Sequence, residues 1–324
     1  MILGTKQIWK QLHDSFFFLN VGYEKQPSTM PSTLDLTKAT IGTLINTASG
    51  SCDDTSERAM LDIMQSLKIG HVQSWCADAN TLQESLSEVG KAKLDVLVVL
   101  GGDGTIRSAI KAVEGSKTHV IPLPGGTMNM LPKALYGERT WQEALTDTLQ
   151  NPEVRPVSAG RIEDDSFFVA AIVGSVTEIT SARESLREGK VMEAAKKGVE
   201  ALSHAFDSSI HFQVDGGIEQ ESAAIALICP LTSKVLSNSA PMLELIALNI
   251  ESAKDIFPLL TAAASGEWRT ASSVASLNIV SATLSSHSNI AAVLDGEQCE
   301  YGTSVSVSFL PAAFTTLVPA TAAT

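Results

Sequence analysis

The residues best suited to chemistry in this chain form a short glycine-rich segment from Gly101 to Thr105, with the sequence Gly-Gly-Asp-Gly-Thr. It directly follows an unbroken apolar run, Val96 to Leu100, which is typical of a strand buried on both faces of a parallel sheet. A helical pattern begins at Ile106. Glycines between a strand and a helix let backbone N–H groups approach an anion, and the helix dipole favours negative charge there. We therefore expect a phosphate-binding loop at Gly101 to Thr105, which we call the cradle.

The acidic residue of the cradle, Asp103, allows two interpretations. Its carboxylate would repel a bare phosphate, so it makes chemical sense as a group that faces Mg²⁺ or accepts a hydrogen bond. The alternative is a tight turn between strand and helix in which Asp103 serves as an acidic helix cap. The residue types at this position leave both interpretations open.

Two other loops of small and polar residues are expected beside the cradle. Asn46 to Gly50 follows a predicted strand over Ala39 to Ile45, and Gly125 to Asn129 follows one over His119 to Leu123. Because ligands of parallel α/β sheets bind at the carboxyl ends of the strands, all three loops should lie at one edge. Far downstream, the segment Leu294 to Glu297 adds two acids, although on its own it indicates an ordinary hairpin turn.

The elements that must position these loops change character along the chain. Up to about residue 150, predicted strands alternate with helical patterns, which describes a parallel α/β domain. From Ile210 to Val214 onward, alternating strands dominate, as in Ser304 to Leu310. One stretch, Ser276 to Thr283, reads as a single strand. We therefore predict an N-terminal α/β domain with a parallel sheet, followed by a mainly antiparallel β-sandwich domain.

We expect the domain boundaries at changes in composition. Residues 1–38 are an N-terminal extension, residues 39–155 the α/β domain, and residues 156–318 the β-sandwich domain. Two arrangements are open for the last strand, which either stays in the β-sandwich or returns to the first domain. Two helical patterns, near Arg183 to Ala205 and near Ala253 to Ala264, interrupt the second domain. No internal repeat is present.

Composition and charge exclude several classes of function. The formal net charge of −13, without a basic stripe, argues against a nucleic-acid partner and gives no attraction to anionic lipid. The four cysteines are scattered, which favours reduced thiols in the cytoplasm. No apolar run approaches the roughly 18 residues of a membrane span. We expect a cytoplasmic protein with at most transient contact at a membrane surface.

The ordered series of motifs resembles the diacylglycerol kinase catalytic-domain family, which includes bacterial lipid kinases and the sphingosine and ceramide kinases. The resemblance covers roughly Ile41 to Phe309. NAD kinases share the Gly-Gly-Asp-Gly-Thr element but are disfavoured by the Asp295-Gly296-Glu297 segment and by the loop after Pro124. A dinucleotide fingerprint would need a glycine at Arg107, and no Gly-x-x-x-x-Gly-Lys-Ser/Thr motif occurs.

The resemblance implies a kinase that holds ATP and Mg²⁺ and transfers the γ-phosphoryl group to a hydroxyl of a lipid such as diacylglycerol. It makes Glu297 the proton acceptor and Asp103 the acid that organises Mg²⁺ through the nucleotide. It implies a lipid or amphiphilic alcohol as substrate and allows a homodimer. The residues implied to bind the cofactor are Asn46, Thr47, Ser49, Gly50, Gly101, Gly102, Gly104, Thr105, Gly126, Thr127 and Asn129.

Several positions depart from the family pattern. Family acids are replaced at Met130 and near Ser158, and a family metal segment falls at Ser239 to Pro241, so we expect that metal site to be lost. A nucleotide-contacting threonine is replaced by Cys76. These losses keep a second hypothesis open, a catalytically weak nucleotide- or lipid-binding homologue. Arg107 is either a phosphate ligand or an ordinary exposed helix arginine.

Overall fold

The computed structural model describes residues 34–53, 55–69, 72–174, 209–233, 235–248 and 274–320. The helical patterns expected at 183–205 and 253–264, and nearly all of the expected extension at 1–38, lie outside these residues. Within the described part of the chain, no helix is long and apolar enough to cross a membrane.

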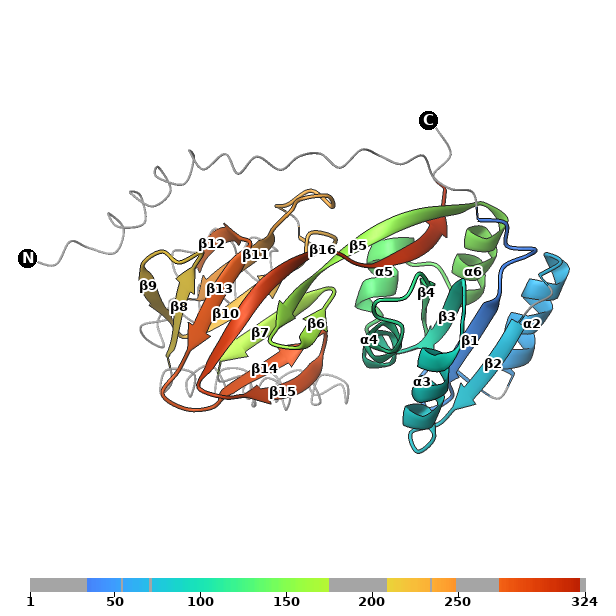
Figure 1. Cartoon of the computed structure of the whole chain (residues 1–324), viewed down its shortest axis with the longest axis horizontal. Helices are drawn as coiled ribbons and strands as arrows, with labels where there is room; N and C mark the ends of the chain where they lie inside the picture. Colours follow the sequence, from blue (N-terminus) through green and yellow to red (C-terminus); the bar gives the residue numbers. More distant parts are fainter. Residues whose placement is uncertain are drawn as a thin grey trace, which may run out of the picture. The chain divides into compact units, whose positions relative to one another are not determined.

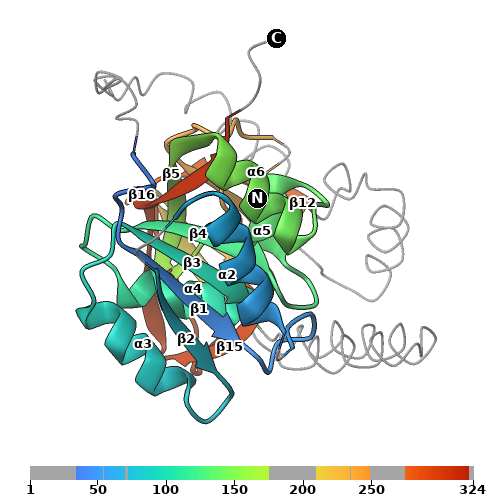
Figure 2. The same ribbon diagram turned by 90° about the vertical axis from the view of Figure 1, so that its right-hand side faces the viewer.

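The first half of the described chain alternates strands with helices (Figures 1 and 2). Its elements are β1 (Ile41–Asn46), α2 (Ser56–Ser66), β2 (Val72–Ala77), α3 (Leu82–Lys91), β3 (Val96–Gly101), α4 (Asp103–Ala112), β4 (His119–Pro124), α5 (Met130–Tyr136) and α6 (Trp141–Gln150). The four strands lie in the order β2-β1-β3-β4, and each neighbouring pair is parallel. The predicted α/β domain with a parallel sheet is confirmed.

Helices cover both faces of this sheet. On one face, Val96, Val98 and Leu100 of β3 pack in one core cluster with side chains of α2 and α6. On the other face, Leu97 and Val99 pack in a second cluster with side chains of α3 and α4. Because every β3 residue is buried on one face or the other, the strand carries the unbroken apolar run seen in the sequence.

Helix α4 begins at Asp103, three residues before the predicted start at Ile106. The backbone leaves the extended conformation directly after Gly102, which is the N-cap. The first turn of α4 consists of Asp103, Gly104 and Thr105, none of which is a large apolar residue. A prediction based on the spacing of apolar residues therefore misses it. The second part of the cradle is therefore the first turn of α4 rather than a loop.

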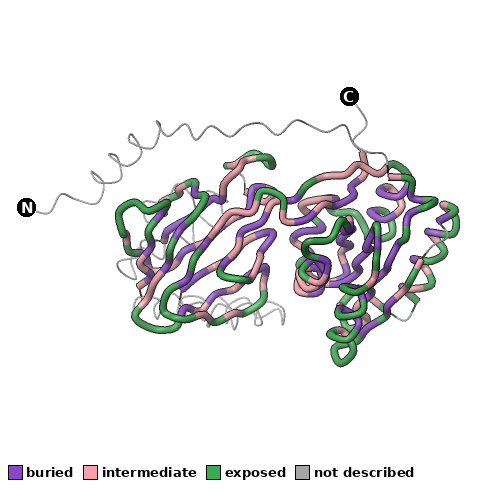
Figure 3. The backbone as a smooth tube through the Cα atoms, viewed as in Figure 1, coloured by how far each residue is buried: buried purple, intermediate pink, exposed green. Residues whose placement is uncertain are grey.

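The second half of the described chain is built from strands. They are β5 (Pro152–Ile162), β6 (Asp165–Phe167), β7 (Ala170–Gly174), β8 (Ile210–Val214), β9 (Glu219–Ser222), β10 (Ala224–Ile228), β11 (Leu243–Leu248), β12 (Val274–Ile279), β13 (Ser281–Ser285), β14 (Ile290–Leu294), β15 (Glu297–Tyr301) and β16 (Ser304–Pro319). One antiparallel sheet has the order β12-β11-β10-β7-β14-β15. Buried residues alternate with partly or fully exposed ones along strands such as β8 and β14. Figure 3 shows the burial of each described residue along the backbone. The predicted antiparallel second part of the fold is confirmed.

The long strand β16 connects the two halves. It pairs antiparallel with β5 and β13, and its end pairs parallel with β4 through Thr315 and Thr316. The alternating pattern in the sequence predicts a strand only as far as Leu310, but the strand continues to Pro319. A single sheet therefore runs from the parallel α/β half into the antiparallel half.

The stretch predicted as one strand over Ser276 to Thr283 is two strands. β12 and β13 are separated at Val280 and belong to different sheets. The buried positions change phase across Val280, from Ile279 to Ala282 and Leu284. The change of sheet carries no turn signal, because no glycine or proline marks it.

Candidate active site

The first polar loop contacts the cradle through two side chains. The Asn46 side-chain amide donates a hydrogen bond to Thr105 Oγ1 at 2.8 Å, and the Gly102 N–H donates one to Ser49 Oγ at 3.2 Å. Both bonds join residues more than fifty positions apart in the sequence. The loop after β1 therefore fixes both ends of the cradle, as the parallel topology predicts.

The third loop packs against the cradle through glycine backbone. Gly125 N–H donates to the Gly101 carbonyl at 2.9 Å, and a Cβ on Gly126 would lie 2.6 Å from Gly102 Cα. No side chain other than hydrogen fits at either contact without a shift of backbone. Asn129, at φ 52°, closes this loop by bonding to both polar backbone groups of Gly126.

The first turn of α4 exposes backbone donors. The first hydrogen bond of the helix runs from Ile106 N–H to the Gly102 carbonyl at 3.0 Å. Among the described residues, no acceptor contacts the N–H groups of Asp103, Gly104 or Thr105. Unpaired amides at a helix N-terminus, together with the helix dipole, form a binding site for an anion such as a phosphate group.

Asp103 connects two helices. Its Oδ1 accepts a hydrogen bond from the backbone N–H of Leu131 in the first turn of α5, at 3.3 Å, and it makes no side-chain cap of its own helix. The carboxylate is half-buried. Within the described ranges, no cluster of three His, Cys, Asp or Glu side chains could hold a metal ion by itself.

Glu297 lies directly beside the cradle. A Cβ added to Gly104 would be 2.6 Å from Glu297 Oε1 and 3.1 Å from its Cδ. Glu297 is exposed and begins β15, so the antiparallel half of the chain supplies an acidic side chain to the first turn of α4. The sequence gives only the order of the cradle and Glu297 along the chain. In the structure they are adjacent.

The turn before Glu297 is anchored by a buried carboxylate. Asp295, 7% exposed and at φ 49°, accepts hydrogen bonds from the backbone N–H groups of Phe168, Val169 and Ala170 at 2.7, 2.9 and 3.1 Å. Burial raises the pKa of the Asp295 carboxyl from 3.8 to about 6, while these three bonds and the positive charge of Arg107 act in the opposite direction. The hairpin turn that this segment indicates on its own is present between β14 and β15, but the sequence does not predict the burial of Asp295.

Arg107 also contacts this turn. Its guanidinium donates a hydrogen bond to the Leu294 carbonyl at 3.3 Å, and its side chain is half-buried. The interpretation as an ordinary exposed helix arginine is therefore wrong. No sequence signal predicts this contact, because it joins residues 187 positions apart.

Other expected cofactor residues lie in the loops, with their side chains engaged elsewhere or exposed. The Thr47 hydroxyl donates to the Ala77 carbonyl at 3.2 Å. Thr127 is exposed, and a Cβ on the exposed Gly50 would meet no atom within 4 Å. Their roles toward a nucleotide remain predictions.

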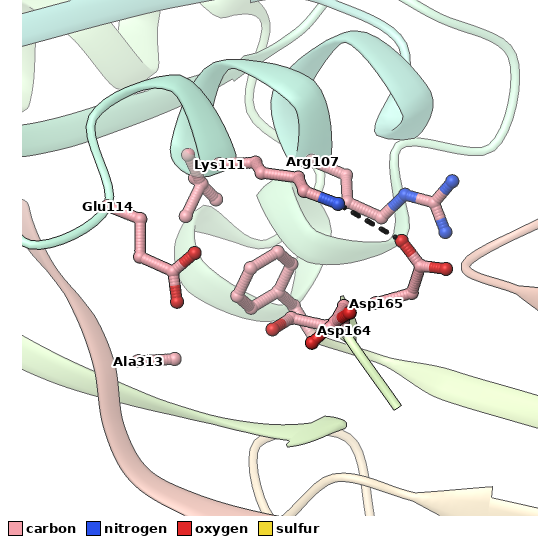
Figure 4. Close-up of a pocket in the computed structure, with 9 residues that line it drawn as sticks. Arg107, Lys111, Glu114, Asp164, Asp165 and Ala313 are labelled. Atoms are coloured by element: carbon pink, nitrogen blue, oxygen red, sulfur yellow. Dashed lines mark hydrogen bonds and ion pairs between the residues drawn. The ribbon is translucent and has the colours of Figure 1, made fainter. Parts of the chain in front are cut away.

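A small pocket lies further along α4, between that helix and the β5–β6 hairpin (Figure 4). Lys111 reaches across it to Asp165, with 3.2 Å between Nζ and Oδ1. The pocket shares Arg107 with the turn but includes none of the cradle residues. The cradle is therefore a separate feature at the N-terminal end of the same helix.

The fold and the site place a glycine-rich helix N-terminus of a parallel α/β half beside an acidic side chain supplied by an antiparallel half. Residues 40–162 match the family model described as the diacylglycerol kinase catalytic domain. This part of the chain is similar to that family. The match contains the cradle and both neighbouring loops and ends before Glu297.

Similar proteins carry the same description. A diacylglycerol kinase of Bacillus subtilis (strain 168) is 25% identical over 169 residues, which cover 51% of this chain and 54% of that protein, so the match spans about half of the relative. A crystal structure of a diacylglycerol kinase from Bacillus anthracis str. Sterne has a TM-score of 0.67 and 16% identity, covering 86% of this chain and 97% of that chain. Another structure from that organism gives a TM-score of 0.68 at 15% identity over the same shares. These structural matches establish the fold.

Proposed function

We propose that the protein is an ATP-dependent kinase that transfers the γ-phosphoryl group to a hydroxyl of a lipid such as diacylglycerol. The observation that carries the proposal is the position of the Glu297 carboxylate beside Gly104, in the first turn of α4, where backbone N–H groups have no acceptor among the described residues. The match of residues 40–162 to the diacylglycerol kinase catalytic domain supports ATP as the phosphoryl donor.

In this proposal the cradle binds the phosphates through its backbone. The N–H groups of Asp103, Gly104 and Thr105 donate to phosphate oxygens, and the dipole of α4 adds to the attraction. Asn46 and Ser49 keep the cradle in shape through their bonds to Thr105 and Gly102. Since phosphoryl transfer depends mostly on positioning and charge stabilisation, a rigid cradle is the main requirement.

Glu297 is the proposed proton acceptor. As the lipid oxygen forms its bond to the γ-phosphorus, the bond from that phosphorus to the leaving oxygen of ADP breaks, and the hydroxyl proton passes to the Glu297 carboxylate. Asp295 is unsuited to this step because its two carboxylate oxygens are buried and accept three backbone N–H bonds.

The donor set also fits Mg²⁺. Asp103 uses Oδ1 for the Leu131 N–H, and among the described residues its Oδ2 has no partner. One carboxylate together with nucleotide phosphates and water is a common way to hold Mg²⁺, because this ion keeps much of its hydration shell. When bound, the ion would offset negative charge on the phosphates.

The acceptor determines where the reaction takes place. A diacylglycerol or sphingoid acceptor resides in a membrane, so the proposal includes transient contact with a membrane surface. No helix among the described residues could span the bilayer, so a peripheral mode of contact is consistent with them.

The test is a transfer assay with γ-labelled ATP, Mg²⁺ and the purified chain. Mixed micelles of diacylglycerol, ceramide or a sphingoid base are offered separately, with NAD as a soluble acceptor. We expect label in one lipid, in proportion to the amount of protein. Calorimetric ATP binding without label in any lipid would support the catalytically weak homologue instead. Label in NAD would identify an NAD kinase.

A further inference from the structure

One face of α4 contacts the antiparallel half of the chain along its whole length. The contacting positions are spaced by three, four and three residues, which places them on a single helix face. Figure 4 shows part of this face, with Arg107 and Lys111 extending from the helix toward Asp165. The contacts pair Gly104 with Glu297, Arg107 with Leu294, Lys111 with Asp165, and Glu114, just beyond the helix end, with Arg161.

The two contacts nearest the cradle have matching spacing. Gly104 and Arg107 are three residues apart on the helix, and their partners Glu297 and Leu294 are three residues apart across the β14–β15 turn. The turn therefore lies along one turn of the helix, with its acidic end at the cradle. A shift of the turn along α4 would carry Glu297 away from the unpaired amides.

The turn keeps its own shape without α4. The Asp295 carboxylate and N–H together make four hydrogen bonds with the backbone of residues 168–170, all within the antiparallel half. Removal of Arg107 should therefore leave the turn folded and affect its attachment to α4. The Lys111–Asp165 pair is exposed on both sides and should contribute little, because exposed ion pairs are screened by water.

We propose that Arg107 is a positioning residue that holds the β14–β15 turn in register with the cradle, so that Glu297 stays at the transferring phosphoryl group. The inference rests on the proposed function for the role of Glu297, and on the Arg107–Leu294 contact for the attachment itself. The guanidinium suits this position because it stays charged, so it favours the buried carboxylate of Asp295, and its fixed donors reach a backbone carbonyl.

Hydrogen exchange tests the attachment without any need for activity. We compare Arg107→Ala with Arg139→Ala, a matched control in which the lost guanidinium bonds to a carbonyl, that of Tyr136, within the α/β half. In the absence of nucleotide, amides of residues 294–301 should exchange several-fold faster in Arg107→Ala and at the wild-type rate in Arg139→Ala. Equal rates in wild type and Arg107→Ala would overturn the proposal.

Kinetics test the consequence for transfer. In Arg107→Ala, kcat should fall by about 10- to 100-fold, because small displacements of a catalytic group are costly, while the Kd for ATP changes less than about twofold. Arg107→Lys keeps one donor and should recover part of the rate. A large rise in the Kd for ATP, with unchanged kcat at saturation, would instead make Arg107 a phosphate ligand and overturn the proposal.

The two experiments separate this inference from the proposed function. If the wild-type chain transfers no phosphoryl group to any acceptor but exchange at residues 294–301 still responds to Arg107→Ala, the kinase proposal fails and the attachment stands. If transfer is observed and Arg107→Ala changes neither exchange nor kcat, the kinase proposal stands and the positioning role fails.

Discussion

The cradle and the β14–β15 turn meet at one site, but they are built in opposite ways. The cradle is local in sequence, since a buried strand, two glycines and the first turn of α4 follow one another from Val96 to Thr105. The turn depends on partners 125 to 127 residues earlier in the chain, at Phe168 to Ala170. Local order in sequence is enough to form the proposed anion site, whereas the acid that faces it requires the whole fold.

The two regions also differ in how their polar groups are satisfied. The cradle amides of Asp103, Gly104 and Thr105 have no acceptor among the described residues, while both carboxylate oxygens of Asp295 accept bonds from the backbone. An unsatisfied region is suited to receive a ligand, because binding supplies the missing acceptors. A satisfied region is suited to hold a neighbouring side chain still. This difference supports the proposed roles, ligand binding for the cradle and positioning for the turn.

The largest effect on transfer should come from Glu297→Gln. The amide keeps the shape of the side chain but cannot accept the proton, so kcat should fall by about 10²- to 10⁴-fold. The Kd for ATP should stay the same, as measured by calorimetry. Glu300→Gln is the matched control, because Glu300 lies on the same strand and accepts a bond from the Asn289 amide. Equal turnover in Glu297→Gln would remove Glu297 from the mechanism.

A smaller loss is expected from Gly104→Ala. The added methyl would lie 2.6 Å from Glu297 Oε1, so the carboxylate must move away from the cradle, and kcat should fall by about tenfold or more. Alanine favours the helix by up to about 1 kcal/mol, so the melting temperature should not fall with the activity.

Gly302→Ala is the control for this variant. A Cβ on Gly302 would meet no atom within 4 Å, and the backbone there is not left-handed. If Gly104→Ala retained wild-type turnover, the close approach of the turn to the cradle would have no part in transfer.

The ionisation of Asp295 should have the smallest effect on transfer but a clear effect on how the free energy of unfolding depends on pH. Its folded pKa of about 6 lies above the ordinary value of 3.8, so between pH 4 and 6 the folded chain holds a proton that the unfolded chain has lost. The free energy of unfolding should therefore decrease as the pH rises through this window, by at most about 3 kcal/mol, since each pKa unit corresponds to about 1.4 kcal/mol.

Denaturant unfolding at several pH values measures this slope, and Asp295→Asn should abolish its part of it. A carbon NMR titration of the wild-type carboxyl gives the same information without a variant and should have its midpoint near pH 6. A midpoint near pH 4 would show that the hydrogen bonds to residues 168–170 and the charge of Arg107 together offset the cost of burial.

Much of the fold could be predicted because its signals are local. The apolar run of β3 marks a strand with two buried faces, and the glycines after it mark the cradle. Hydrophobic spacing predicts the start of α4 too late, because Asp103 and Gly104 are not apolar and therefore do not belong to the pattern of buried residues. β16 was placed too short because its alternation is lost near a register shift between Leu310 and Phe314.

The candidate site could be predicted only in its parts. The order of the motifs pointed to Glu297 and the cradle, but no spacing in the sequence says that a side chain at 297 will lie beside a glycine at 104. Asp295 looked like a turn residue because burial and three backbone donors arise from packing of distant strands. The contact of Arg107 could not be predicted because its partner is a backbone carbonyl, a group that nearly every residue type carries.

In the proposed function, the phosphates of ATP bind to the first-turn amides of α4 beside Glu297. The most direct test is an amide NMR titration of the isotope-labelled chain with ATP and Mg²⁺. The largest shifts should occur at Asp103, Gly104 and Thr105, with smaller ones at Glu297 and none at Gly302. Saturable shifts confined to the pocket around Lys111 and Asp165, with the cradle amides unmoved, would contradict this proposal.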